Sequence, residues 1–145
     1  MAGYSGTPLP KKLGIVGDVV FTTVGEPPTF APALGDYGEA VWQRSLLAPL
    51  DVVVAFATAR AQLTRLWPKI TAPLTPAGAV WIAWPKKSSG VPTDLTEDVL
   101  RDVLLPTGWV DNKVCAIDDT WSGLRFVLRK EHRRGASSGA ENRRK

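Results

Sequence analysis

Two apolar runs near the centre of the chain limit the folds that it can adopt. Residues 51–56 are nearly all Val and Ala, and residues 79–84 contain no charged residue. Neither run alternates between apolar and polar side chains, so each predicts a strand covered on both faces, as in parallel sheets. A helical pattern follows each run and allows a crossover to a parallel neighbour. The sequence therefore predicts an α/β domain around a mostly parallel sheet.

The other predicted elements are shorter. The pattern indicates strands over residues 19–24 and 39–43, a helical turn over 30–34, and closing strands over 113–117 and 124–128. The short connection between the closing strands makes them an antiparallel hairpin. Thr58 is the expected N-cap of a helix that runs to Ile70. Asp94 is the expected N-cap of a helix that runs to about Leu105, and Glu97, three residues later, could reach back to the N–H of the cap. We expect a small Rossmann-like three-layer α/β domain, mostly parallel and ending in an antiparallel hairpin.

The net charge of +4 is distributed unevenly. Residues 129–145 hold seven basic and two acidic residues, a net +5, which leaves −1 for the rest of the chain. We divide the chain into an N-terminal arm (1–18), the Rossmann-like domain (19–130) and a basic tail (131–145). The tail has little to bury, which favours a disordered end. The alternative is weak nucleic-acid binding through its basic residues.

The composition argues against several classes of protein. No apolar run approaches the roughly 20 residues that cross a bilayer, and the N-terminus has no secretory signal pattern. Cys115 is the single cysteine, which favours a reducing cytoplasm, and we expect it to be a buried apolar side chain. His132, the single histidine, lies in the tail, which argues against a catalytic triad or a zinc site. We expect a cytoplasmic protein without membrane contact.

The predicted order of elements resembles the carboxyl-terminal half of the methyltransferase-type Rossmann fold, which ends in such a hairpin. That resemblance implies a glycine-rich turn after the first strand and a carboxylate at the end of the second, which hold the cofactor. Here the turn is Gly25-Glu26-Pro27-Pro28, in which the prolines have no N–H to donate. The second strand ends in Gln43-Arg44. We therefore expect no cofactor in the usual mode.

Longer motifs carry a second resemblance. They lie at residues 3–9 and 11–15, at Trp81-Ile82-Ala83-Trp84-Pro85-Lys86-Lys87 with residues 90–97, and at residues 110–118 and 120–124. They resemble the opening, central and closing motifs of a bacterial family known as domain of unknown function 3052. The resemblance covers nearly everything up to Arg129. It implies no particular activity.

The candidate binding residues follow the predicted strands, at the edge of the sheet where open α/β folds bind ligands. The loop after the second apolar run is basic. Its lysines could hold a phosphate or carboxylate while backbone and hydroxyl groups assist. An exposed basic loop explains the same residues, and this alternative stays open. The loop residues are Lys86, Lys87, Ser88, Ser89 and Gly90.

Four further residues complete the predicted site. Trp84 and Trp121 could flank the crevice and stack on a planar ligand, although strand tryptophans are more often core residues. Asp94 and Asp118 supply carboxylates, which a helix cap and a turn explain equally well. Asp118 with Asp119 is a carboxylate pair that suits acid–base work or a cation. We assign no catalytic residue and no metal ligand.

The function expected from the sequence is a non-catalytic binding or regulatory module. Its crevice would take a small anion or a protein partner through Trp84, Lys86 and Lys87. The first alternative is a divergent S-adenosylmethionine-dependent methyltransferase that uses Asp118 or Asp94. The second alternative is weak nucleic-acid binding through the basic tail.

Overall fold

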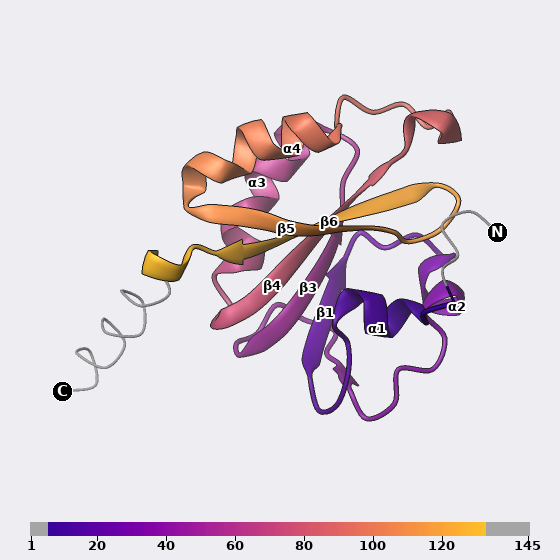
Figure 1. Ribbon diagram of the computed structural model, residues 1–145, viewed down its shortest axis with the longest axis vertical. Helices are drawn as coiled ribbons and strands as arrows, with labels where there is room; N and C mark the ends of the chain where they lie inside the picture. The colour runs from indigo at the N-terminus through magenta and orange to yellow at the C-terminus, as the bar shows by residue number, and fades with distance from the viewer. Residues whose placement is uncertain (1–5, 133–145) are drawn as a thin grey trace.

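The computed structural model describes residues 6–132 of the chain. One six-stranded sheet has helices on both faces (Figure 1). The strands overlap their predicted positions, although three of them begin several residues earlier than predicted: β4 at Leu74 rather than Ala79, β5 at Trp109 rather than Lys113, and β6 at Trp121 rather than Leu124. In chain order the elements are α1 (Leu9–Leu13), β1 (Val20–Val24), α2 (Phe30–Leu34), β2 (Val41–Trp42), β3 (Leu50–Phe56), α3 (Arg60–Thr71), β4 (Leu74–Pro85), the 3-10 helix η1 (Lys87–Ser89), α4 (Glu97–Leu104), the 3-10 helix η2 (Leu105–Thr107), β5 (Trp109–Ala116) and β6 (Trp121–Leu128).

The strands form one mixed sheet in the order β2-β1-β3-β4-β6-β5. β1 pairs in parallel with β2 and β3, and β3 pairs in parallel with β4. β6 is antiparallel to both of its neighbours, β4 and β5. It is therefore the one described strand that runs against the others. The predicted α/β fold, mostly parallel with an antiparallel hairpin, is confirmed.

Each face of the sheet has its own apolar core. α3 and α4 cover one face, where Leu63 and Leu100 are fully buried. α1 and α2 lie on the other face, where Leu13 and Phe30 are fully buried. Strand β3 contributes to both cores because its side chains alternate between the faces. This explains the unbroken apolar run that the sequence shows there.

The predicted boundary between an N-terminal arm (1–18) and the domain does not fit the described residues around α1. Leu9, Leu13 and Ile15 are buried against the sheet. The indole Nε1 of Trp81, itself fully buried in β4, donates to the Leu13 carbonyl oxygen at 2.9 Å. The short apolar pattern of this segment is too brief to predict a helix. Packing against the sheet stabilises it, and the segment belongs to the domain.

Both predicted helix caps are also wrong. The N-cap position of α3 is Ala59 rather than Thr58, and no side chain caps it from that position. α4 begins at Glu97, and its N-cap is Thr96, whose side chain accepts from the Val99 N–H at 3.2 Å. Asp94 therefore lies before α4 and has a different role, described below.

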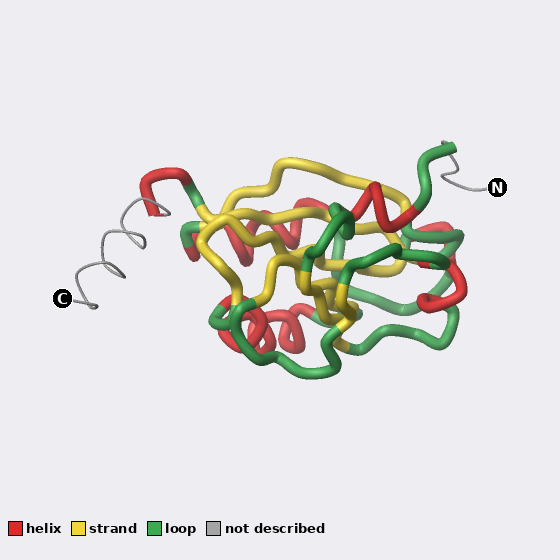
Figure 2. The backbone as a smooth tube through the Cα atoms, turned by 90° about the horizontal axis from the view of Figure 1, so that it is seen from below, coloured by secondary structure: helices red, strands yellow, loops and turns green. Residues whose placement is uncertain are grey.

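The first and last described residues lie at opposite ends of the molecule in both views (Figures 1 and 2). Val127 of β6 pairs with Ala79, near the start of the paired run of β4. β6 therefore ends at the amino-terminal edge of the parallel strands, away from their carboxyl ends. The predicted tail lies outside the described residues beyond His132.

Candidate functional site

The carboxyl ends of the parallel strands meet at one edge of the sheet, here called the carboxyl edge. The strand order reverses between β1 and β3, and open α/β sheets bind ligands at such a switch point. Gly25 directly follows β1 there with a φ of +68°. A Cβ at this position would lie 3.2 Å from the Phe56 carbonyl oxygen at the end of β3. Close approach of the two strand ends therefore requires glycine at this point.

The predicted basic loop follows β4 at the same edge and forms the 3-10 turn η1 (Figure 1). Lys87 and Ser88 are exposed, whereas Lys86 and Ser89 are half-buried. The Ser89 hydroxyl donates to the Lys86 carbonyl oxygen at 2.6 Å and accepts from the Val91 N–H at 3.2 Å. The Lys86 N–H donates to the Thr120 carbonyl oxygen at 2.8 Å. These polar groups fix the loop and leave the lysine side chains at its surface.

Asp94 joins this loop to the first turn of α3. Its Oδ1 accepts from the Arg60 N–H at 2.7 Å, so it caps a helix from a distant segment. Beside it, the Thr93 hydroxyl donates to the Thr58 carbonyl oxygen at 2.6 Å. The two contacts are here called the Thr93–Asp94 latch. They pair the Arg60 N–H, a first-turn donor for which the Ala59 cap position supplies no acceptor, and the Thr58 carbonyl oxygen just before the helix. The structure therefore gives Asp94 a structural explanation, although not as the cap of α4.

Asp118 is also held within its own turn. Its Oδ1 accepts from the N–H groups of Thr120 and Trp121, both at 2.8 Å. Asp119 is exposed next to it. Asp118 therefore closes the β5–β6 turn, the common local role of aspartate.

The two predicted aromatic contacts lie on opposite faces of the sheet. Trp84 is 7% exposed in the core below α3 and α4. Trp121 is half-buried on the other face, with its ring centroid 5.1 Å from that of Phe56. Successive strand side chains alternate between faces, and Trp121 pairs with Pro85 rather than Trp84. The two rings therefore do not flank one crevice.

The groups around the β1 and β2 ends differ from a usual nucleotide cofactor site. Pro27 and Pro28 offer no N–H after Gly25. At the end of β2, Gln43 Nε2 donates to the Ser45 and Leu47 carbonyl oxygens at 3.0 and 2.7 Å. The Arg44 guanidinium lies 3.9 Å from the ring centroid of Trp42. A cation therefore lies where a ribose-binding carboxylate is expected.

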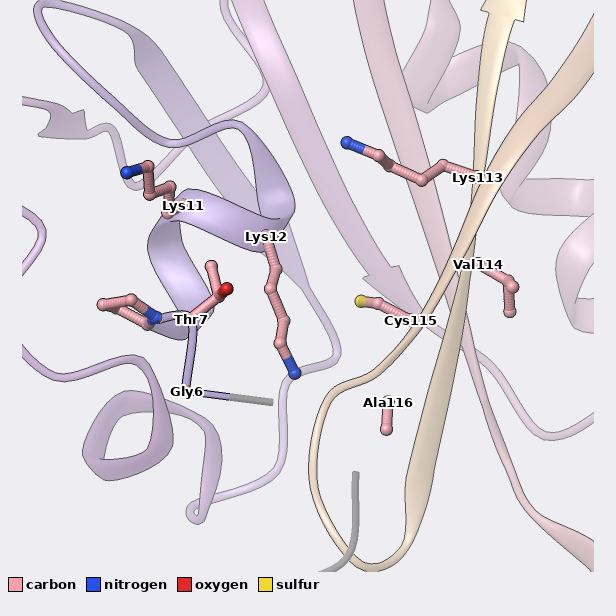
Figure 3. Close-up of a pocket in the computed structure, with 9 residues that line it drawn as sticks. Gly6, Thr7, Lys11, Lys12, Lys113, Val114, Cys115 and Ala116 are labelled. Atoms are coloured by element: carbon pink, nitrogen blue, oxygen red, sulfur yellow. The ribbon is translucent and has the colours of Figure 1, made fainter. Parts of the chain in front are cut away.

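A pocket of about 720 Å³ lies between α1 and β5, and sequence reasoning missed it (Figure 3). Its two basic walls are about one hundred residues apart in the chain, so no local motif marks it. The lysines of the two walls are the sequence feature that could have indicated this pocket. The described residues that line it are Gly6, Thr7, Pro8, Lys11, Lys12, Lys113, Val114, Cys115 and Ala116.

Cys115 lines this pocket and is half-buried, so the prediction of a buried apolar residue needs correction. It lies on the edge strand β5, where α1 covers it only in part. Burial raises the pKa of its thiol to about 11, although the charges of Lys12 and Lys113 lower it. The thiol is therefore protonated at neutral pH and has little nucleophilic character.

The described residues 6–132 contain no group of three or more His, Cys, Asp or Glu side chains placed to hold a metal ion. Within the same residues, no helix is both long and apolar enough to span a bilayer.

Comparison with solved structures shows the fold. A proposed type 11 methyltransferase from Sulfolobus solfataricus matches with a TM-score of 0.58 and 12% identity, over 84% of this chain and 90% of that one. Fibrillarin from Aeropyrum pernix, described with natively bound S-adenosyl-L-methionine, matches with a TM-score of 0.53 and 14% identity, over 78% of this chain and 68% of that one. Magnesium protoporphyrin IX methyltransferase from Synechocystis, with bound SAH, matches with a TM-score of 0.51 and 11% identity, over 79% of this chain and 75% of that one. The chain thus has a methyltransferase-like Rossmann fold.

No protein-family model and no curated protein sequence matches this chain. The resemblance to the family of domain of unknown function 3052 therefore stays a prediction.

Proposed function

We propose that this chain is a divergent S-adenosylmethionine-dependent methyltransferase. The observation that carries the proposal is the likeness of its fold to proteins described as methyltransferases, two of them with S-adenosylmethionine or SAH bound. This likeness supports the methyltransferase over the non-catalytic module that we expected from the sequence. At 11–14% identity the likeness concerns the fold, and the activity is our inference.

The switch point between β1 and β3 is where we expect the methyl donor. Gly25 lets the backbone come close to a ligand there, because no Cβ stands in the way. Glu26 follows directly and is half-buried. Its carboxylate is our candidate acceptor for ribose hydroxyl groups, which a carboxylate binds in nucleotide-binding α/β folds.

The usual anchors of the cofactor do not fit this edge. Pro27 and Pro28 remove backbone donors, and Arg44 stands at the end of β2 in place of a carboxylate. A methyl donor bound here is therefore held in a different way from that of the usual site.

The loop after β4 is the proposed substrate side of the edge. Lys86 and Lys87 carry charge that suits an anionic substrate, with Ser88, Ser89 and Gly90 beside them. Trp121, Asp118 and Asp94 lie on neighbouring segments of the same edge. Trp84, which is buried, belongs to this group only as a support for the loop. We keep the cytoplasm as the expected compartment.

A non-catalytic binding module is the second candidate, and the Thr93–Asp94 latch favours it. The latch uses the N–H of Arg60 and the carbonyl oxygen of Thr58, groups at the start of α3 that a ligand at this edge would otherwise meet. Such a module would bind a small anion or a protein partner through Lys86 and Lys87. Nucleic-acid binding through the tail is a third proposal, on residues mostly outside those described.

Isothermal titration calorimetry with S-adenosylmethionine and S-adenosylhomocysteine tests the first proposal. We expect binding by the wild type, at least tenfold weaker binding by Glu26→Gln, and unchanged binding by the control Glu39→Gln, which alters an exposed glutamate. No heat of binding at millimolar donor would refute the methyltransferase.

A thermal unfolding series separates the other two candidates. Ligand at one hundred times its dissociation constant stabilises the native state by about 2.7 kcal/mol. Stabilisation by phosphate that disappears in Lys86→Ala/Lys87→Ala would support the binding module. Salt-sensitive nucleic-acid binding that disappears on truncation after Lys130 would support the tail.

A further inference from the structure

The face of the sheet that carries α1 and α2 has an open, basic area at its β5 edge. α1 and α2 share their core with β1, β3 and β4, and β5 contributes only the half-buried Cys115. Lys113 and Cys115 extend from β5 toward α1, whereas Val114 points away from it (Figure 3). Lys11 and Lys12 of α1 form the opposite wall. Three lysines and no acidic residue line the pocket among the described residues.

The strand register adds a fourth cation beside this pocket. Lys113 of β5 is directly opposite Arg125 of β6, so both side chains leave the sheet on the same face. Like charges directly opposite each other on neighbouring strands destabilise a sheet. Neither Lys113 nor Arg125 forms an ion pair with a carboxylate of the described residues, and the ion pairs of Arg101 lie on the other face.

Arg125 is the more enclosed of these two cations. Its side chain is half-buried, and Nη1 donates to the neutral Asn112 Oδ1 at 3.1 Å. Burial lowers the pKa of its guanidinium, because the charged form loses contact with water. Buried or half-buried cations are usually paired with an anion. Here the described chain provides only an amide oxygen.

We propose that the pocket between α1 and β5 binds a small organic anion, a phosphate or carboxylate carried on a nucleotide-sized body. Lys12 and Lys113 face the anionic group from the two walls, and Lys11 adds positive charge on the far side of α1 (Figure 3). The anion also neutralises the Lys113–Arg125 pair. The volume of about 720 Å³ lies within the range of roughly 300–1,000 Å³ that small-molecule sites occupy. This volume fits a small molecule of nucleotide size.

This pocket is a different place from the proposed methyl-donor site. Its walls are α1 and the edge strand β5, whereas Gly25 lies at the switch point between β1 and β3. The inference does not rest on the proposed function, and probes without a methyl donor test it separately.

Thermal unfolding with pyrophosphate and with adenosine monophosphate tests the proposal, against sodium chloride at equal ionic strength. We expect both probes to raise the midpoint of the wild type. We expect the double variant Lys11→Gln/Lys113→Gln to lose most of this rise, since it removes two charges from exposed positions. The matched control is Arg65→Gln/Lys69→Gln on α3, which removes two exposed charges from the other face and keeps the full rise.

The stability of the variants without probe gives a second test of the proposal. If the Lys113–Arg125 pair serves to bind an anion, Lys113→Gln alone removes a like-charge repulsion and raises the midpoint of thermal unfolding without probe. The same variant lowers the increase in midpoint that the probe causes. A residue with a merely structural role does not give these opposite changes. Equal rises in the pocket variant and the control would refute the site. The absence of a rise at 10 millimolar probe would also refute it, since this concentration is on the order of ten-thousandfold above a micromolar dissociation constant.

Cys115 reports the location of binding, because it is the single cysteine and lines the pocket. Saturating adenosine monophosphate is expected to slow its alkylation by iodoacetamide at pH 9 at least fivefold in the wild type and not in Lys11→Gln/Lys113→Gln. An unchanged alkylation rate in the wild type would place the anion elsewhere and overturn the proposal.

Discussion

Asp94 provides the sharpest test of how the carboxyl edge is built. Its Oδ1 accepts from the Arg60 N–H at 2.7 Å, and α3 has no side-chain cap of its own. Removal of an N-cap carboxylate costs 0.5–2 kcal/mol, and a negative charge near a helix N-terminus contributes about 0.3–1 kcal/mol. We expect Asp94→Ala to lower the free energy of unfolding by about 1–2 kcal/mol. Asp94→Asn keeps an acceptor and loses only the charge, so it should cost about 0.3–1 kcal/mol.

Urea unfolding followed by tryptophan fluorescence measures both losses, provided that the m-values stay equal. Asp119→Ala is the matched control, since Asp119 is exposed and should change stability by less than about 0.5 kcal/mol. Equal stability of Asp94→Ala and Asp119→Ala would refute the capping role. Equal losses of unfolding free energy in Asp94→Ala and Asp94→Asn would show that the hydrogen bond is not the source of the stabilisation by Asp94. If Asp94→Ala kept its stability and lost ligand binding, Asp94 would be a binding residue rather than a helix cap.

Three further predictions concern Trp81, Gly25 and Cys115. Trp81→Phe leaves the Leu13 carbonyl oxygen without its donor, and urea unfolding should show a loss of about 1–3 kcal/mol. Gly25→Ala places a Cβ 3.2 Å from the Phe56 carbonyl oxygen at a φ of +68°, so its unfolding midpoint should fall by an amount equivalent to about 1–3 kcal/mol; an unchanged midpoint would contradict the close approach. Because burial raises the pKa of the Cys115 thiol to about 11, its alkylation rate should still rise above pH 10, where an ordinary thiol with a pKa of 9.0 has levelled off.

The fold was largely predictable because its signals are local. The apolar run in β3 follows from burial on both faces, and the short connection after β5 leaves no room for a parallel crossover. α1 was missed because a helix of five residues has no stability of its own. Its order depends on Trp81, a residue 68 positions away.

The site was less predictable because side-chain roles depend on distant partners. Asp94 has the sequence context of a cap for α4, yet it caps α3, 34 residues earlier. Trp84 and Trp121 lie on the neighbouring strands β4 and β6, but the pairing of Trp121 with Pro85 places the two rings on opposite faces. The pocket between α1 and β5 has no sequence motif, since only the packing of α1 on the sheet brings Lys11 and Lys113 into one pocket.

The position of β6 has a consequence for the order of folding. β6 is the last described strand in the chain, yet it lies between β4 and β5 and joins them into one sheet. Until residue 128 has left the ribosome, the twelve-residue strand β4 keeps one edge of unpaired N–H and C=O groups. Such an edge is a template for pairing with other chains, and contacts between distant segments form slowly. The nascent chain is therefore most prone to aggregation between the emergence of β4 from the ribosome and that of β6, and a deletion within β6 exposes that edge permanently.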